Sequence, residues 1–268
     1  MIITRTPFRM SFFGGGTDMP EFFNEHGGSV ISSTFDKYCY VTARHLPPFF
    51  DYSTELVYSK IERVEDPSEL EHPAVRNAMA MLDMHEIRIS YEADLPARSG
   101  LGTSSSFAVG MLNAFHCMKG TYAPKERLAK EAIKLERELC AEAGGWQDQV
   151  AAAFGGLNRI DFSDNGFTVR PIIISSERKS KLESNLMLFF TGFTRFSSDM
   201  QKKNHVADKT AQLQEMLALV DVAESVLTDK QKNLAEFGWL LDATWKLKRG
   251  TGSRVSTGSI DDLYERGI

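Results

Sequence analysis

A glycine-rich stretch at residues 94–107 constrains this chain most, because it separates two hydrophobic patterns of different period. Residues 87–92 alternate between apolar and polar side chains, which predicts a strand with one buried face. After the stretch, Phe107, Met111 and Phe115 recur at the spacing of a buried helical stripe. The predicted order is therefore strand, glycine-rich turn and helix.

The turn contains Gly100 and Gly102, and hydroxyl residues occupy 103–106. Glycine has no Cβ, so the backbone can turn sharply and approach a ligand closely. The hydroxyl residues fall on the first helical turn, where unpaired backbone N–H groups suit an anion. An ordinary capped helix is the alternative, but one cap needs fewer such residues. The stretch has neither the lysine of a P-loop nor the third glycine of the dinucleotide fingerprint. We interpret it as a phosphate-binding loop of another kind.

The composition is that of a globular protein of one large or two moderate domains, with 268 residues, 42% hydrophobic and 25% charged. A net charge of −5 argues against a broad surface for nucleic acid or anionic membrane. Cys39, Cys117 and Cys140 show no metal-binding spacing and indicate reduced thiols. The first residues contain no long apolar core of the kind found in signal peptides, and no apolar run approaches the roughly 20 residues of a membrane span. We expect a cytoplasmic protein with neither nucleic acid nor membrane as a partner.

A second glycine-rich turn follows the first predicted strand. The strand covers 2–13 with an interruption at Pro7, and it runs into Gly14-Gly-Gly-Thr-Asp18. Asp18 suits either of two roles: it caps a helix over 21–24, or it accepts hydrogen bonds from ligand hydroxyls brought close to the backbone. The residues leave both roles open.

One carboxylate stands out in the helix predicted from Pro124 to about Leu139. At 100° per residue, Glu136 falls near the middle of the apolar arc of that helix. A buried carboxylate is costly unless it is paired, hydrogen-bonded or bound to a cation. The alternatives are a structural salt bridge and a metal ligand that faces an anionic site.

Asp148 is the third candidate functional carboxylate, after Asp18 and Glu136. It follows Gly144-Gly145 and precedes the apolar residues 150–154, so it lies at a turn between two buried elements. A helix N-cap is one interpretation. The other is a general base, which needs only to reach the proton that it abstracts.

The remaining pattern gives a coarse map of the chain. We predict strands at 29–45 and 55–64, a helix at 69–84, a hairpin at 157–175 around Asp164-Asn-Gly166, a domain boundary in the polar run 175–184, a buried strand at 186–190, and helices at about 198–228 and 231–248. The basic run after Lys248 is either a phosphate contact or a mobile loop. The predicted domains are 1–174 and 175–268.

Three motifs in order resemble the GHMP family, named for galactokinase, homoserine kinase, mevalonate kinase and phosphomevalonate kinase. Pro7 to Asp18 resembles the first motif, Leu95 to Ser106 resembles the ATP phosphate loop, and Gly145-Trp-Gln-Asp-Gln149 resembles the segment with the catalytic aspartate of sugar kinases. Residues 241–248 and 255–261 are most similar to the heptose-phosphate kinases of this family.

The resemblance implies an α+β, two-domain GHMP-kinase-like fold. Its N-terminal domain would resemble domain 2 of ribosomal protein S5, and its C-terminal domain would be ferredoxin-like. The family's third motif, a glycine-rich loop, would follow residues 261–268, so we expect the C-terminal domain to be incomplete in this sequence.

The resemblance also assigns roles. ATP phosphates would bind Pro96, Ser99, Gly100, Leu101, Gly102, Thr103, Ser104, Ser105 and Ser106, and Ser105 with Glu136 would hold Mg²⁺. Asp148 would accept the proton of the anomeric hydroxyl, and Arg9 would stabilise the transferring phosphoryl charge. The substrate would contact Gly15, Gly16, Thr17 and Asp18, with Arg44, Lys248 and Arg249 for a phosphate that it already carries.

The implied reaction is ATP-dependent phosphorylation of D-glycero-D-manno-heptose 7-phosphate to the 1,7-bisphosphate, for GDP-heptose and surface-polysaccharide synthesis. The alternatives are a kinase of an unphosphorylated sugar, such as L-fucose or a galactokinase substrate, and a sugar-sensing paralogue without catalysis. A decarboxylase of the same superfamily is a further alternative, which the Gly-Gly-Gly-Thr-Asp turn disfavours. The sequence leaves a homodimer open.

Overall fold

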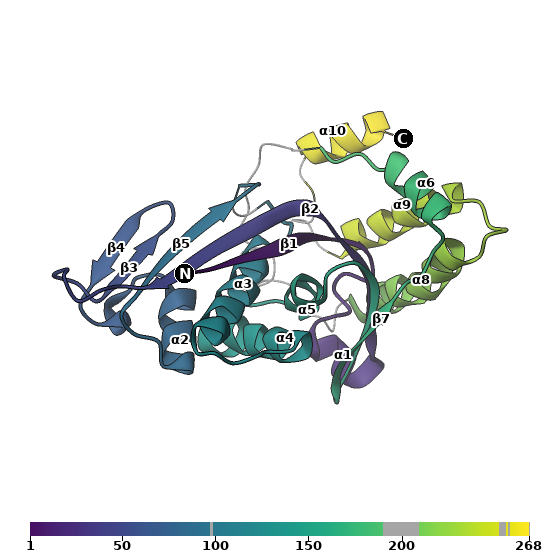
Figure 1. The fold of residues 1–268 in the computed structure, drawn as a ribbon. Helices are drawn as coiled ribbons and strands as arrows, with labels where there is room; N and C mark the ends of the chain where they lie inside the picture. Colours follow the sequence, from purple (N-terminus) through teal and green to yellow (C-terminus); the bar gives the residue numbers. More distant parts are fainter. Residues whose placement is uncertain (97–98, 190–208, 252–255, 257, 268) are drawn as a thin grey trace. The chain divides into compact units, whose positions relative to one another are not determined.

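The computed structural model describes residues 1–96, 99–189, 209–251, 256 and 258–267 (Figure 1). The chain forms two compact units: Met1–Met10 with Thr34–Gly155, and Ser11–Ser33 with Gly156–Ile268. The long strands β1 (Ile2–Phe13) and β2 (Gly28–His45) pair with each other, and each has residues in both units. This partition follows contacts rather than one chain position, so the predicted domains 1–174 and 175–268 stay a prediction.

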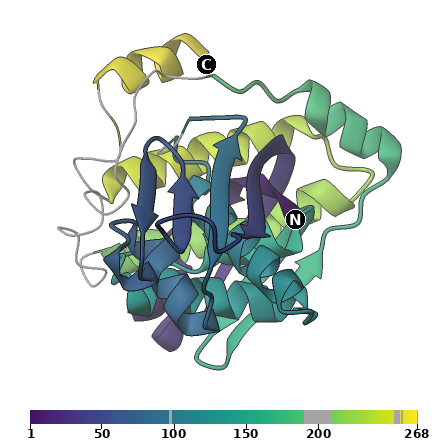
Figure 2. The same cartoon turned by 60° about the vertical axis from the view of Figure 1, so that its left-hand side comes forward.

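The first unit packs helices against a sheet. Its strand order is β4 (Ile61–Val64), β3 (Thr54–Val57), β5 (Ile87–Ala93) and β2. β3 and β5 are parallel, whereas β3 with β4 and β2 with β5 are antiparallel. The ribbon places α2 (Pro73–Leu82), α3 (Thr103–Met118), α4 (Lys125–Ile133) and α5 (Gln147–Phe154) on one side of these strands (Figures 1 and 2).

The predicted strand, turn and helix are confirmed as β5, the glycine-rich loop and α3. The stripe of Phe107, Met111 and Phe115 is buried, as its spacing requires. These side chains belong to one core that also includes Phe8 of β1 and Ile89 of β5. The core fixes α3 against the sheet, and through α3 it fixes the end of the loop.

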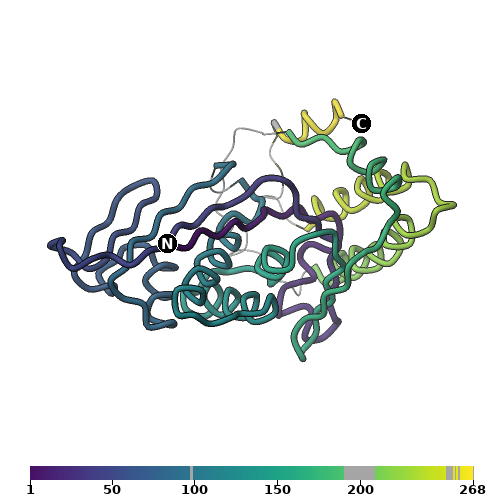
Figure 3. Tube along the Cα trace, in the orientation of Figure 1, coloured from purple at the N-terminus to yellow at the C-terminus, as the bar shows by residue number. Residues whose placement is uncertain are grey.

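The second unit is built on the first half of β2. This half pairs with β6 (Leu157–Ser163), which forms the predicted hairpin with β7 (Gly166–Pro171). Its helices are α1 (Pro20–His26), α6 (Ser176–Ser184), α8 (Thr210–Thr228), α9 (Ala235–Gly250) and α10 (Gly258–Gly267), which the trace follows in chain order (Figure 3). Phe13, Val220 and Phe237 lie in its core.

Several predicted boundaries were wrong. β1 continues through Pro7, because β1 pairs with β2 alone among the described strands and an edge strand tolerates a missing N–H. The strand predicted at 55–64 is the hairpin of β3 and β4. The helix predicted at 69–84 is α2, which follows a single 3₁₀ turn, η1 (Pro67–Glu69).

The polar run 175–184 forms helix α6, whose first turn is capped by the Ser175 hydroxyl, and the domain boundary predicted there stays a prediction. One prediction in this region was wrong. Residues 186–189 form no strand, and their side chains are exposed. The helix predicted from 198 is described from Thr210, and residues 190–208 lie outside the described part. No helix in the described ranges is long and apolar enough to cross a membrane.

Candidate active site

The glycine-rich loop has the backbone of an anion-binding turn. Gly100 and Gly102 have φ values of 79° and 73°, a region that side chains strongly disfavour. α3 begins directly after Gly102, and no side chain caps its first N–H groups. The Arg9 N–H donates to the Leu101 carbonyl at 3.1 Å, so β1 holds the loop in place. A Cβ on Gly102 would lie 3.0 Å from Cγ of Arg9, so this position also admits the arginine.

The hydroxyls of the loop divide into different roles. Ser106 is buried and donates to the Pro7 carbonyl at 2.9 Å, which anchors α3 to β1. Ser104 and Ser105 each donate to one carboxylate oxygen of Glu136, both at 2.6 Å. Ser99 has a buried hydroxyl oxygen without a hydrogen-bond partner in the described part of the chain. The hydroxyl of Ser106 thus supports the fold, and the other three are available to a ligand site.

Glu136 is almost fully buried, with 1% of its surface exposed. It lies in η2 (Lys134–Leu139), a π-helical turn in which the N–H of Cys140 donates to the Leu135 carbonyl five residues back. Sequence periodicity predicted one continuous α-helix to Leu139, so this turn is a correction. Gln149 adds a third donor to the carboxylate through its Nε2. Every one of these donors is neutral.

This arrangement disagrees with a structural salt bridge. Among the described residues, Glu136 forms no ion pair, so its negative charge is not balanced by a protein cation. A carboxylate oxygen and serine hydroxyl oxygens are the hard donors that Mg²⁺ prefers, and Mg²⁺ binds one or two carboxylates together with substrate phosphates. The described residues contain no group of three or more His, Cys, Asp or Glu that would hold a metal alone. The donor set therefore fits a cation that is shared with a phosphate ligand.

Arg9 and Asp148 form a bidentate ion pair beside the loop. Nε and Nη2 of Arg9 lie 2.8 and 2.6 Å from the two carboxylate oxygens of Asp148. Nη1 of the same guanidinium donates to the Gly100 carbonyl at 3.0 Å. The Asp148 side chain is 25% exposed, so it keeps access to a ligand. One arginine thus joins the loop to the aspartate.

Asp148 lies in the first turn of α5, one residue inside the helix, and its N-cap is Trp146. The interpretation of Asp148 as an N-cap was therefore wrong. The loop before α5 is held by Arg137, which donates to the carbonyls of Glu142, Ala143 and Gly145 at 3.1–3.3 Å. Sequence reasoning missed Arg137 and Gln149 as contributors to the site. The only available signal was their position next to Glu136 and Asp148.

The predicted substrate residues 15–18, in the glycine-rich turn that follows β1, belong to the second unit. Asp18 is 3% exposed and accepts from the Gly16 N–H at 2.9 Å, while α1 has Met19 as its N-cap. The helix-capping alternative for Asp18 was therefore wrong. The Thr17 hydroxyl donates to the carbonyls of Gly14 and Ser29, which ties the turn to β2. Gly15 is part of the same turn.

The three basic residues predicted to bind a phosphate of the substrate lie in different parts of the fold. Lys248 and Arg249 are exposed in the last turn of α9, in the second unit, and Arg249 pairs with Asp261 at 3.4 Å. Arg44 lies opposite Arg88 at the start of β5, whereas the phosphate loop follows the other end of that strand. Arg44 is therefore not brought to the phosphate loop, and its contact with a phosphate of the substrate stays a prediction.

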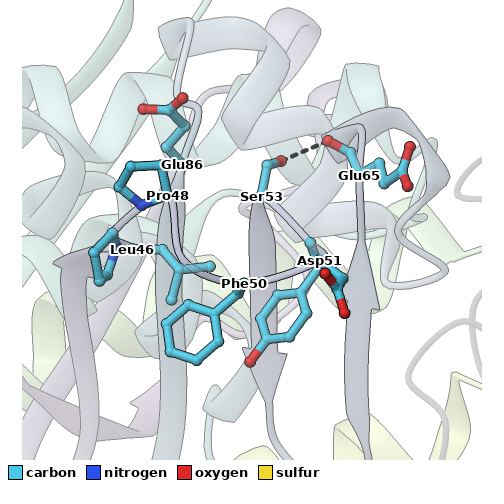
Figure 4. A pocket seen from close by; sticks show the side chains of 9 residues that line it. Leu46, Pro48, Phe50, Asp51, Ser53, Glu65 and Glu86 are labelled. Atoms are coloured by element: carbon cyan, nitrogen blue, oxygen red, sulfur yellow. Dashed lines mark hydrogen bonds between the residues drawn. The ribbon is translucent and has the colours of Figure 1, made fainter.

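A pocket of about 310 Å³ opens near this end of β2 (Figure 4). Its lining residues are Leu46, Pro47, Pro48, Phe50, Asp51, Tyr52, Ser53, Glu65 and Glu86. None of the predicted site residues lines it. Its three carboxylates carry the wrong charge for a phosphate, so we exclude it from the candidate site.

Comparison with known proteins identifies the class. Residues 70–156 match the family model described as the GHMP kinases N terminal domain. D-glycero-alpha-D-manno-heptose 7-phosphate kinase of Campylobacter jejuni is 28% identical over 283 aligned residues, which cover 100% of this chain and 83% of that protein. The bifunctional fucokinase/GDP-fucose pyrophosphorylase of Arabidopsis thaliana is 24% identical, over 97% of this chain and 27% of that protein.

The fold agrees with this class. The crystal structure of a D-glycero-D-manno-heptose 1-phosphate kinase from Bacteroides thetaiotaomicron superposes with a TM-score of 0.77 at 23% identity, over 96% of this chain and 82% of that one. The predicted GHMP-kinase-like α+β fold is therefore confirmed. Residues 70–156, which contain the phosphate loop, Glu136 and Asp148, form a GHMP kinase N-terminal domain.

Proposed function

We propose that this protein is an ATP-dependent sugar kinase and that its acceptor is the anomeric hydroxyl of a heptose 7-phosphate. The observation that carries the proposal is the Arg9–Asp148 pair beside the glycine-rich loop, because it joins a proton acceptor to a phosphate site. The similarity to a heptose 7-phosphate kinase, which spans 100% of this chain and 83% of that protein, supports the choice of sugar. The product would be the 1,7-bisphosphate.

The loop would bind the ATP phosphates. Gly100 and Gly102 allow close approach of the backbone, and the uncapped N–H groups at the start of α3 suit the terminal phosphates. Glu136, with the hydroxyls of Ser104 and Ser105, would hold Mg²⁺. The bound cation would neutralise charge between the β- and γ-phosphates. Ser104 is the exposed hydroxyl of the two and is better placed than Ser105 to face a ligand.

Asp148 would accept or orient the proton of the attacking hydroxyl. Its two oxygens each accept one hydrogen bond from Arg9, and an ionised carboxylate has about four acceptor positions in total. A further hydroxyl can therefore donate to Asp148 without breaking the pair. Arg9 fixes the carboxylate and adds positive charge near the transferring group. Asp18 remains our proposal for a contact with sugar hydroxyls.

A panel of sugars tests the proposal, with ADP release from ATP as the measurement. It should include D-glycero-D-manno-heptose 7-phosphate, the corresponding 1-phosphate, the free heptose, L-fucose and galactose. Both heptose phosphates are needed, because one related kinase is named for the 7-phosphate and another for the 1-phosphate. The 7-phosphate should give the highest kcat/KM. A higher kcat/KM for an unphosphorylated sugar would reject heptose 7-phosphate as the acceptor but would still support a sugar kinase.

A second candidate is an L-fucose kinase. It is supported by the 24% identity to the plant fucokinase over 97% of this chain. Sugar-stimulated ADP release that is greatest with L-fucose would select it. No stimulation by any sugar would favour the non-catalytic, sugar-sensing alternative.

A further inference from the structure

Gln149 is a fully buried amide beside the candidate site, with 0% of its surface exposed. It follows Asp148 in the first turn of α5, and its Nε2 donates to Oε2 of Glu136. Chemistry fixes the orientation of the amide, because a turned amide would place its oxygen against a carboxylate oxygen. The contact therefore specifies which atom of Gln149 faces Glu136.

The other end of the amide is also informative. Oε1 of Gln149 is buried and has no hydrogen-bond partner among the residues that the structure describes. A buried acceptor without a partner is costly, so an apolar side chain would fill this place better if packing were its whole purpose. The amide is retained at a position where only its donor is used within the described chain.

We infer that Gln149 is a positioning residue, which holds the Glu136 carboxylate in the orientation that binds a divalent cation. This inference rests on the proposed function, because it assigns the cation to Glu136. Partners of metal ligands orient those ligands, and their loss typically weakens metal binding or activity by about 10–100-fold. Oε1 of Gln149 would accept a hydrogen bond from a water molecule that the cation retains.

The position of Gln149 in the chain gives this contact a second effect. Asp148, its neighbour, is held by Arg9, which also donates to the Gly100 carbonyl of the phosphate loop. Glu136, its partner, also accepts from Ser104 through Oε1 and from Ser105 through Oε2, and both serines belong to the same loop. The first turn of α5 therefore links the predicted base and the predicted metal ligand, and Gln149 supplies the second of these links.

Nucleotide binding with and without metal tests the inference without relying on turnover. Calorimetry gives the Kd of ADP in excess Mg²⁺ and again in EDTA, and the ratio of the two is the gain in affinity due to the metal. Gln149→Met removes the donor and keeps an unbranched side chain of similar length. We expect the gain to fall by about 10-fold or more, with the Kd in EDTA unchanged.

A matched control separates positioning from stability. Val150→Ala removes buried volume from the neighbouring position of α5 without touching Glu136, so it should lower Tm and leave the metal-dependent gain unchanged. The exchange Glu136→Gln with Gln149→Glu keeps an amide and carboxylate in contact, so it should fold if the Met variant does not. It should still lose the gain, because the carboxylate has moved to α5.

The outcomes distinguish the two proposals. A normal gain in Gln149→Met overturns the positioning role and leaves the kinase proposal intact. A normal gain in the exchanged pair overturns the placement of the cation on Glu136, and the positioning role with it. A wild-type protein that binds ADP equally with Mg²⁺ and with EDTA overturns the metal site and the positioning role together.

Discussion

The carboxylates of two regions in this protein are stabilised in opposite ways. In the second unit, Arg159 contacts Asp161 and Glu224 at 2.7 and 2.8 Å and also pairs with Asp221. Burial opposes the charge of this guanidinium, but the hydrogen bonds that it donates to the three carboxylates outweigh burial and raise the pKa of Arg159. This cluster balances its charge within the protein.

In the first unit, Glu136 is more deeply buried and receives only neutral donors. The difference teaches how to separate a structural cluster from a binding site. A cluster with its own cations balances its charge within the fold, whereas for a buried charge held by hydroxyls and an amide we propose a cation from outside. Asp148 combines both features, because it has a cation partner and is also exposed to a ligand.

The largest expected effect is that of Asp148→Asn. A general base typically contributes about 10²–10⁴-fold, so kcat should fall by a factor in this range. The affinity for ADP with Mg²⁺ should stay unchanged, because Asp148 does not contact Glu136 or the loop hydroxyls in the described structure. ADP release and calorimetry measure the two quantities. Near-normal turnover would reject the base assignment.

Glu136→Gln tests the comparison at the predicted metal site, because it removes the charge of the buried carboxylate. The serine hydroxyls can rotate to accept from the new amide, so the fold should be kept and the free energy of unfolding should not fall. The metal-dependent gain in ADP affinity should fall by about 100-fold, which is the upper end of the loss found when the surroundings of a metal ligand are changed. Glu138→Gln, an exposed change in the same π-helical turn, is the control and should keep the gain.

Glu224→Gln is the corresponding change in the structural cluster. It removes the charge that faces Arg159 and Arg170, so the free energy of unfolding should fall by about 1 kcal/mol. Turnover and the metal-dependent gain should not change. Urea unfolding measures the loss, with the exposed Glu215→Gln of the same helix as control. A loss of metal dependence here would remove the distinction between the clusters.

The smallest expected effect concerns His72, which belongs neither to the Arg159 cluster nor to the Glu136 site. Its protonation makes the free energy of unfolding depend on pH. Burial lowers the pKa of His72, although Glu62 opposes this shift. A depressed histidine pKa favours the neutral form in the folded protein. Its contribution to stability is therefore present above about pH 6.5 and lost as the pH falls through the folded-state pKa.

His72→Phe keeps the aromatic contacts with Tyr58 and Phe107 and removes the titration. The variant should lose less stability than wild type between about pH 6.5 and pH 5. Urea unfolding at a series of pH values checks this. Equal slopes would show that the acid sensitivity arises elsewhere.

The sequence was most informative where one chain segment contains the whole signal. The strand, loop and α3 follow from local period, and the burial of Glu136 follows from its place in an apolar arc. Local pattern failed at residues 186–189, because four apolar residues in a row do not say what covers them.

Contacts between distant residues could not be obtained from pattern. Arg9 and Asp148 are 139 residues apart, and only the family resemblance suggested that they meet. Gln149 and Arg137 were missed because their importance depends on partners that the fold brings to them. The place of Arg44 opposite Arg88 was likewise set by strand register, which residue type does not reveal.

The π-helical turn η2 has a consequence for how this region tolerates change. Each residue of an α-helix advances the chain by about 100°, whereas a turn closed five residues back holds one residue more. Deleting any one residue of Lys134–Leu139 would let the segment close as an ordinary helix and rotate everything after it. Arg137 would then leave the carbonyls that shape the approach to α5. The number of residues in this turn is therefore constrained as well as the identity of Glu136.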